Sequence, residues 1–81
     1  MKIYWDGESK NIIGTRVREL RRERKLTQAA LAGKLQLEGL EIDRITIVRI
    51  ENGQRFVPDY EVRALALVFG VSADDLLRGR V

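Results

Sequence analysis

The sequence of 81 residues contains no cysteine and no histidine. Without cysteine it has no disulfide framework and no thiolate metal site, which indicates a reducing compartment and excludes a stapled secreted scaffold. The usual catalytic bases and nucleophiles are missing as well, and there is no Gly-x-Gly-x-x-Gly or phosphate-loop pattern. We therefore expect no enzymatic activity, no cofactor and no bound metal ion.

The sequence also lacks long apolar runs. No stretch approaches the ~18 apolar residues of a membrane span, and the polar start MKIYWDGESK has no apolar segment of signal-peptide type. We expect a cytoplasmic protein without a membrane partner. The length suits one domain, and the chain shows neither a repeat nor a linker. Residues 1–8 are interpreted as an N-terminal extension and residues 9–81 as the domain.

Positive charge is concentrated in the first third of the chain. The 15 basic and 12 acidic side chains give a net charge of +3 and a pI of about 9.7. Between Lys10 and Lys25, seven basic residues stand against the two acids Glu19 and Glu23. This distribution favours an anionic partner, although a solvated face of lysines and arginines would look similar.

Apolar residues recur at helical spacing in five segments, which predicts an all-α fold of five short helices. The expected helices run over residues 9–25, from 27 to 35–37, over about 43–51, from 58 or 59 to 70, and from 72 to about 78. Their start and stop signals are the N-caps Ser9, Thr27, Asp43 and Ser72 and the stops Gly53 and Gly70. The β-branched third segment RITIVRIE would also suit a strand, but its cap and its stop favour a helix.

The second and third segments together describe a helix-turn-helix. The second helix opens with Thr27 and Gln28 and contains the small residue Ala32, and a short basic helix ending in IENG follows after a turn. A small residue lets the third helix cross the second at close range, where Ile47 and Ile50 present an apolar edge. This arrangement is typical of proteins that read double-stranded DNA.

The opposite face of the third helix would point outwards with Arg44, Ile45, Thr46 and Arg49. Guanidinium groups match the O6/N7 edge of guanine in the major groove, so Arg44 and Arg49 are the candidate base readers. Thr46 would contact a base or a phosphate, and Ile45 a thymine methyl group. Each arginine alone could be a solubilising side chain, but the spacing of the set favours recognition.

Phosphate contacts are expected at both ends of the motif. Thr27 and Gln28, with the backbone amides that open the second helix, are suited to a DNA phosphate, as is Arg55 just past the third helix.

Three segments in this order resemble the phage-repressor-like helix-turn-helix regulators, the Cro and lambda-repressor-like or xenobiotic-response-element family. They are IGTRVRELRRERKLTQAALAGKL, IVRIENG and LALVFGVSADDLL, and the resemblance covers about residues 12–77. It implies a five-helix lambda-repressor-like domain that contacts DNA through Gln28 and the third helix. It also implies an ion pair between Arg21 and Glu51, whose loss would cost about 3 kcal/mol or more because one charge would be stranded.

The sequence departs from this family between the second and third helices. Such motifs turn in about three to four residues, whereas here the segment from Gln36 to Ile42 predicts a lengthened turn. Asp43 is explained as a cap, but Glu38 and Glu41 are not. They would repel DNA if the turn lay against it, would cost little if it folded away, or would bind a basic partner or discriminate against wrong sites.

We interpret the protein as a sequence-specific, double-stranded DNA-binding transcriptional regulator, a repressor that acts by operator occupancy. A homodimer on a pseudo-palindrome with half-sites about 10 bp apart is expected. The candidate interface residues, each of which would also serve as simple packing, are Tyr4, Trp5, Leu67, Val68 and Leu77. The alternative is an antitoxin or anti-repressor type of protein-interaction module, whose partner would be a protein such as a toxin.

Overall fold

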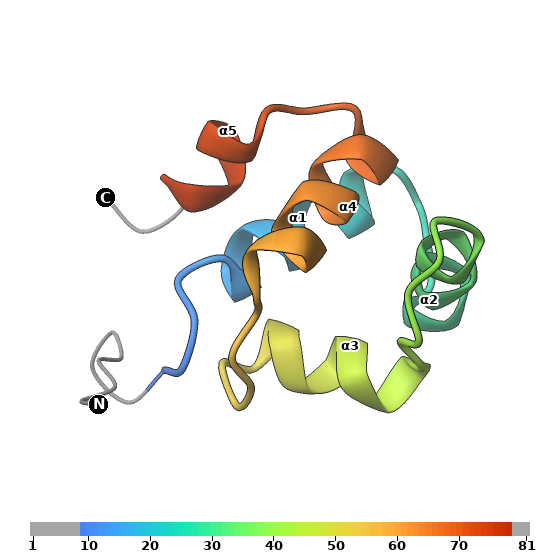
Figure 1. The fold of residues 1–81 in the computed structure, drawn as a ribbon, viewed down its shortest axis with the longest axis horizontal. Coiled ribbons are helices and arrows are strands. Elements are labelled where there is room, and N and C mark those ends of the chain that lie inside the picture. Colours follow the sequence, from blue (N-terminus) through green and yellow to red (C-terminus); the bar gives the residue numbers. More distant parts are fainter. Residues whose placement is uncertain (1–8, 79–81) are drawn as a thin grey trace.

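The structure is a computed structural model that describes residues 9–78. In this range the chain forms five helices and no strand, which confirms the all-α prediction. The helices are α1 (Gly14–Glu23), α2 (Gln28–Leu37), α3 (Arg44–Glu51), α4 (Asp59–Phe69) and α5 (Ala73–Leu77). Figure 1 shows α3 along one edge of the molecule, with α1 and α4 beside it and α5 near the end where the described chain begins and ends.

Most helix boundaries follow from local capping chemistry. The hydroxyl of Thr27 accepts the Ala30 N–H at 3.0 Å and opens α2, and Asp43 Oδ1 accepts the Thr46 N–H at 2.8 Å and opens α3. The Ser72 hydroxyl opens α5 in the same way. Gly70 closes α4 with a φ of +71°, a left-handed conformation that favours glycine. The predicted caps of these helices are therefore confirmed, and the third segment is a helix rather than a strand.

The prediction for the start of the first helix is wrong. We expected Ser9 to cap a helix reaching Lys25, but α1 begins at Gly14 and ends at Glu23. The reason is a local turn, in which Asn11 Oδ1 accepts the N–H groups of Ile13 at 3.2 Å and Gly14 at 2.8 Å. Side-chain bonds of this kind offer the backbone an alternative to helix, so the chain turns at Asn11 and the N-cap position of α1 is Ile13.

The connection between α2 and α3 also differs from the prediction. Gln36 lies inside α2, so the connection runs from Glu38 to the cap Asp43. Its course is fixed by Ile42, which is 2% exposed, and by Gln36 Nε2, which donates to the Ile42 carbonyl oxygen at 2.9 Å. Gly39 turns the chain with a φ of +89°. The longer connection is thus anchored on the core.

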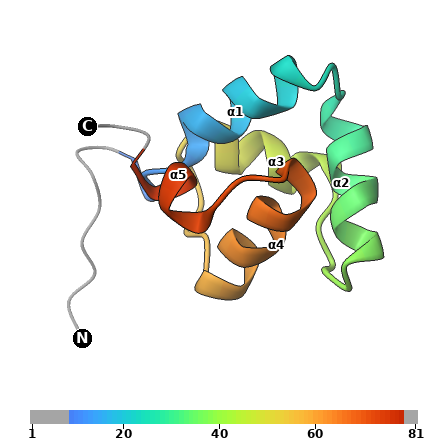
Figure 2. The same ribbon diagram turned by 90° about the horizontal axis from the view of Figure 1, so that it is seen from above.

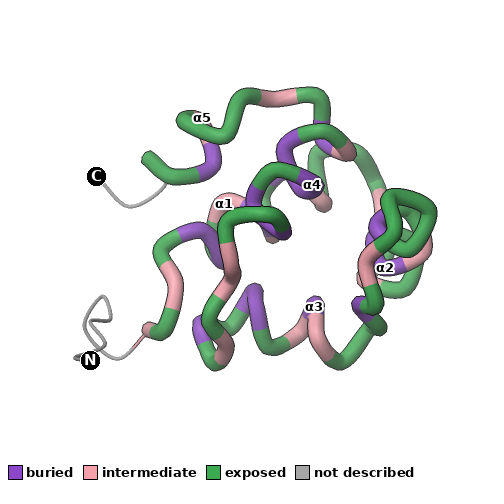
Figure 3. Tube along the Cα trace, in the orientation of Figure 1, coloured by how far each residue is buried: buried purple, intermediate pink, exposed green. Residues whose placement is uncertain are grey.

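The core lies where the helices converge. In Figure 2, α3 lies behind α1 and α4, and α2 closes one side, in agreement with contacts of α3 with α1 and α2 and of α4 with α1, α2 and α5. The largest fully buried side chains are Ile13, Val17, Leu20, Leu31, Leu35, Ile42, Ile47, Ile50, Leu65 and Leu76. Figure 3 shows buried and exposed positions recurring along α3, so this helix has a packed side and an outer side. None of the helices in residues 9–78 has the length and apolar character that a membrane crossing requires.

Candidate nucleic-acid interface

The inner side of α3 is fixed by apolar packing. Ile47 and Ile50 are fully buried, and Ala32 of α2 is 3% exposed. These residues lie where α2 and α3 pack together, and a small residue at position 32 allows a close crossing. Because Ile47, Ile50 and Glu51 of this eight-residue helix are buried, its exposed positions lie on the opposite side.

The outer side of α3 presents three of the predicted DNA-contact residues together. Arg44 and Arg49 are exposed, and Ile45 is 48% exposed. Neither arginine forms a hydrogen bond or an ion pair with any residue in the range 9–78. Their guanidinium groups are therefore free to meet an external partner, while most arginines of α1 are engaged within the protein.

Thr46 is placed differently from its neighbours. Its side chain is half-buried, and its hydroxyl donates to Asp43 Oδ1 at 2.8 Å. The pKa of Asp43 lies below its ordinary value, chiefly because the Thr46 backbone N–H bonds to the carboxylate, with further contributions from the Thr46 hydroxyl and the charge of Arg49. The sequence indicated the backbone cap but not this second bond, which engages the Thr46 donor within the helix start.

Glu51, at the last position of α3, gathers three side chains. Arg21 Nε donates to Glu51 Oε2 at 2.6 Å, Arg18 Nε lies 3.4 Å from Oε1, and Gln28 Nε2 donates to Oε1 at 3.2 Å. The Glu51 side chain has no solvent exposure and that of Arg21 has 11%. The structure therefore brings Arg21 and Glu51 together, and it places the Gln28 amide on this network.

The electrostatic balance at Glu51 favours its charged form. Burial by itself would raise the pKa of the carboxyl, but hydrogen bonds from Arg21 and Gln28 and the charge of Arg21 outweigh it, so the pKa lies below its ordinary value. Arg18 also donates to Asn52 Oδ1 at 2.6 Å. Arg18 was not predicted to take part, although its position three residues before Arg21 on the same helix was a usable signal.

Arg55 lies just past α3, as expected, but its guanidinium is engaged. Nη1 donates to Glu61 Oε1 at 2.6 Å and to the Phe56 carbonyl oxygen at 3.0 Å, and Nη2 donates to Glu61 Oε2 at 3.0 Å. The side chain of Glu61, in the first turn of α4, is only 6% exposed. Arg55 therefore fastens the connection after α3 to α4, a partnership that no local sequence signal indicated.

The two acids Glu38 and Glu41 belong to the connection between α2 and α3. Glu38 lines a shallow hollow of about 210 Å³ with Lys34, Leu37 and Val68, between α2 and α4. This position is off the outer side of α3. Glu41 is exposed. Among the described residues, no group of three or more acidic side chains is placed to hold a metal ion.

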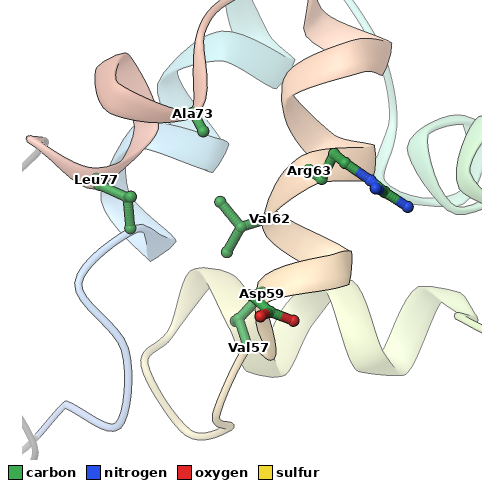
Figure 4. Close-up of a pocket in the computed structure, with 6 residues that line it drawn as sticks. All are labelled: Val57, Asp59, Val62, Arg63, Ala73 and Leu77. Carbon is green, nitrogen blue, oxygen red and sulfur yellow. The ribbon is translucent and has the colours of Figure 1, made fainter.

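The candidate interface residues divide into three cases. Leu67 and Leu77 are 65% and 46% exposed, whereas Val68 is partly buried against the core. Tyr4 and Trp5 lie outside the described residues. Leu77 lines an apolar hollow between α4 and α5 with a volume of about 320 Å³. Figure 4 shows it with the other lining residues, Val57, Asp59, Val62, Arg63 and Ala73.

A short helix with free arginines on its outer side, docked by its inner side on the preceding helix, is the arrangement of a helix-turn-helix DNA-binding domain. The model of the helix-turn-helix domain family matches residues 14–80, and the chain belongs to that family. The family is the lambda-repressor-like type that the sequence segments indicated.

Two solved structures are similar to this chain. The restriction-modification controller protein C.AhdI from Aeromonas hydrophila is 31% identical, with a TM-score of 0.69 over 79% of this chain and 86% of that chain. The DNA-binding domain of BldD is 22% identical, with a TM-score of 0.72 over 90% of this chain and 99% of that chain, and supports the fold. A comparison with curated proteins gave no significant match. The chain is thus a DNA-binding transcription regulator of helix-turn-helix type and not an enzyme.

Proposed function

We propose that the protein is a repressor that reads a specific operator through α3 and blocks transcription by occupying it. The observation that supports this most directly is the pair of outward arginines, Arg44 and Arg49, which have no bonding partner within residues 9–78. They stand on a helix whose other side is fully buried. Unpaired guanidinium groups on a rigid helix can form bidentate bonds to guanine in the major groove.

The side chains of this surface differ in the DNA groups that they can contact. Arg44 and Arg49 read base edges, and Ile45, 48% exposed, meets a thymine methyl group. Thr46 offers its remaining acceptor capacity to the amino group of a base, because its hydroxyl hydrogen is donated to Asp43 and a phosphate has no hydrogen to donate. The opening of α2 at Thr27 and Gln28 faces a phosphate, which its backbone N–H groups can receive. Arg55 adds a phosphate contact with the N–H groups that Glu61 leaves unused.

The position of Glu38 agrees with DNA binding at α3. This carboxylate lies beside Lys34 and Val68, between α2 and α4. An acid on that side is screened from a bound duplex by distance and salt, since screening acts over roughly 8 Å at physiological ionic strength. Glu38 therefore does not oppose the proposed reading of DNA.

We propose that the protein binds as a homodimer through the face formed by α4 and α5. The apolar hollow there and the exposed Leu77 supply surface for a second copy. The longest extent of the fold is 33 Å, and α5 lies near one end of that axis (Figure 1). Two copies joined at this end would hold their α3 helices about one molecular length apart, close to the roughly 34–36 Å between successive half-sites on one side of DNA.

Residues 9–81 form the DNA-binding domain in this role, and residues 1–8 are its extension. Repression by occupancy requires no catalytic step, because a bound dimer excludes the polymerase from the site. Its place of action is the compartment that holds the operator, which we take to be the cytoplasm.

The test is selection of bound duplexes from a random DNA pool, followed by sequencing, at two salt concentrations. The expected result is a two-fold motif with half-sites about 10 bp apart, bound with an affinity that falls steeply with salt. Insertion of that motif between a promoter and a reporter should then lower transcription when the protein is present. Weak binding without any motif would contradict the proposal and favour a protein-binding role of the antitoxin or anti-repressor kind.

A further inference from the structure

The segment that precedes α1 is hydrogen-bonded to the C-terminal end of α3. The Lys10 N–H donates to the Gly53 carbonyl oxygen at 2.7 Å. Asn11 Nδ2 donates to the carbonyl oxygens of Ile50 at 3.1 Å and Arg55 at 2.9 Å. These acceptors lie in the last turn of α3 and in the chain just beyond it, where helical carbonyl groups lack internal partners. Residues 9–14 thus form an N-terminal clamp on the recognition helix.

The side-chain amide of Asn11 makes four hydrogen bonds. Its nitrogen makes the two bonds to the end of α3, while its oxygen accepts the N–H groups of Ile13 and Gly14 at the start of α1. One side chain therefore joins the beginning of α1 to the end of α3. Because each bond has a direction, the amide fixes the relative orientation of the two helices and not only their distance.

Glycines permit this close approach on both sides of the clamp. A Cβ atom at Gly14 would overlap the Ile50 carbonyl oxygen and would lie 3.0 Å from the Glu51 carbonyl oxygen. At Gly53, which has a φ of +73°, a Cβ atom would overlap the Ser9 hydroxyl. The backbones of the clamp and of the α3 end are therefore in contact, with no room for a side chain between them.

We propose that Asn11 is a positioning residue for DNA recognition, which sets the angle at which α3 presents Arg44 and Arg49. This inference rests on the proposed function. Base contacts need donor–acceptor distances of about 2.7–3.2 Å, so a small rotation of α3 breaks bidentate bonds to guanine. The proposed phosphate contacts tolerate such a rotation, because those at the opening of α2 lie on another helix and the Arg55 contact comes from a long side chain. Loss of the Asn11 amide donors should then reduce specific binding more than non-specific binding.

The variant Asn11→Asp isolates the link to α3. The carboxylate keeps an oxygen for the N–H groups of Ile13 and Gly14, but it places a second oxygen against the carbonyl groups of Ile50 and Arg55. Asn11→Ser serves as a second, uncharged variant, because its short hydroxyl can accept a bond from the start of α1 but cannot span to both carbonyls. If Asn11→Asp does not fold, Asn11→Ser provides the same comparison.

The matched control is Phe69→Leu, a core change at the opposite end of α4 from the connection to α3. Phe69 is 3% exposed, so this variant lowers the melting temperature without touching the clamp. The measured quantity is the ratio of specific to non-specific DNA affinity, on the selected operator and on a scrambled duplex, well below every melting temperature.

The expected result is a fall of about tenfold in the affinity ratio for the Asn11 variants, the size of losing one base contact, with the Phe69→Leu ratio within about twofold of the wild type. An Asn11 ratio equal to that of Phe69→Leu would overturn the inference, because the clamp would then serve stability alone, and the proposed function would stand. A wild-type protein that does not distinguish the two duplexes would overturn both.

Discussion

The guanidinium of Arg55 meets the buried carboxylate of Glu61 through two hydrogen bonds, Nη1 to Oε1 at 2.6 Å and Nη2 to Oε2 at 3.0 Å. Glu51 is held by Arg21 in a similar way from α1. These two glutamates are the buried acidic residues within the range 9–78, and both brace the C-terminal end of α3 or the chain that follows it. The buried charges thus hold the recognition helix in place, and the arginines on its outer side remain unpaired.

Removal of Arg21 should destabilise the fold strongly. Arg21→Ala leaves the Glu51 carboxylate buried without its main partner, at an expected cost of about 3 kcal/mol or more in the free energy of unfolding. Urea unfolding followed by circular dichroism measures this cost. Arg22→Ala is the matched control, since Arg22 is exposed on the same helix and its loss should change stability by no more than about 0.5 kcal/mol. Equal effects of the two changes would contradict the assignment.

Stability should fall on the acid side because of Glu51. The folded-state pKa of this carboxyl is lowered below the ordinary value of 4.5, so its contribution is fully present above that value. Below it, the unfolded state takes up the proton first, and the contribution is lost as the pH falls through the folded-state pKa. Thermal melting between pH 7 and pH 3 should show a shallower acid decline for Glu51→Gln than for the wild type. Parallel curves would mean that other carboxyl groups govern the decline.

Local chemistry explains which parts of the fold could be predicted. The side-chain oxygens of Thr27, Asp43 and Ser72 accept N–H groups three residues ahead. Their residue types and positions therefore predict a helix start. Ser9 has the same side-chain chemistry, but it precedes Asn11, whose amide is drawn to Ile50 and Arg55 about forty residues away. The local turn at Asn11 sets the start of α1, and the same amide is held by carbonyl groups that no local sequence pattern reveals.

The candidate site, like the fold, could be predicted only in part from the sequence. Helical spacing around the buried Ile47 and Ile50 correctly placed Arg44, Ile45 and Arg49 on the outer side of α3. The orientation of Thr46, by contrast, depends on a choice between two acceptors, solvent and Asp43, that spacing does not resolve. The engagement of Arg55 depends in turn on Glu61, an acid that the sequence displays as an ordinary first-turn residue of α4. Helical spacing thus predicts on which side of a helix a residue lies, whereas its bonding partner depends on tertiary contacts that the spacing does not show.

A charge at Leu77 should weaken the proposed dimer. Leu77 is 46% exposed beside the apolar hollow between α4 and α5, so Leu77→Asp would place a carboxylate in the contact surface of the second copy. Sedimentation equilibrium should show a dissociation constant raised by about tenfold or more, as expected for an unpaired charge in a desolvated interface. Leu37→Asp is the control, because Leu37 is 87% exposed at the end of α2 and lines the hollow between α2 and α4, not the one between α4 and α5. An unchanged dimer in Leu77→Asp would exclude this face as the interface.

The outer arginines of α3 should be necessary for specific binding and nearly irrelevant to folding. Arg44→Ala combined with Arg49→Ala removes two unpaired guanidinium groups, each expected to contribute about 1–3 kcal/mol of base discrimination if it bonds to guanine. The affinity for the selected operator should therefore approach that for a scrambled duplex, while the melting temperature stays within about 2–3 °C of the wild type because exposed substitutions rarely change stability by more than about 0.5 kcal/mol. Fluorescence anisotropy on the two duplexes, with a melting curve of each protein, provides both readouts.

Arg22→Ala again serves as the control for loss of an exposed positive charge. A large fall in melting temperature would show instead that these arginines support the fold, and an unchanged operator affinity would move the base-reading role to other residues.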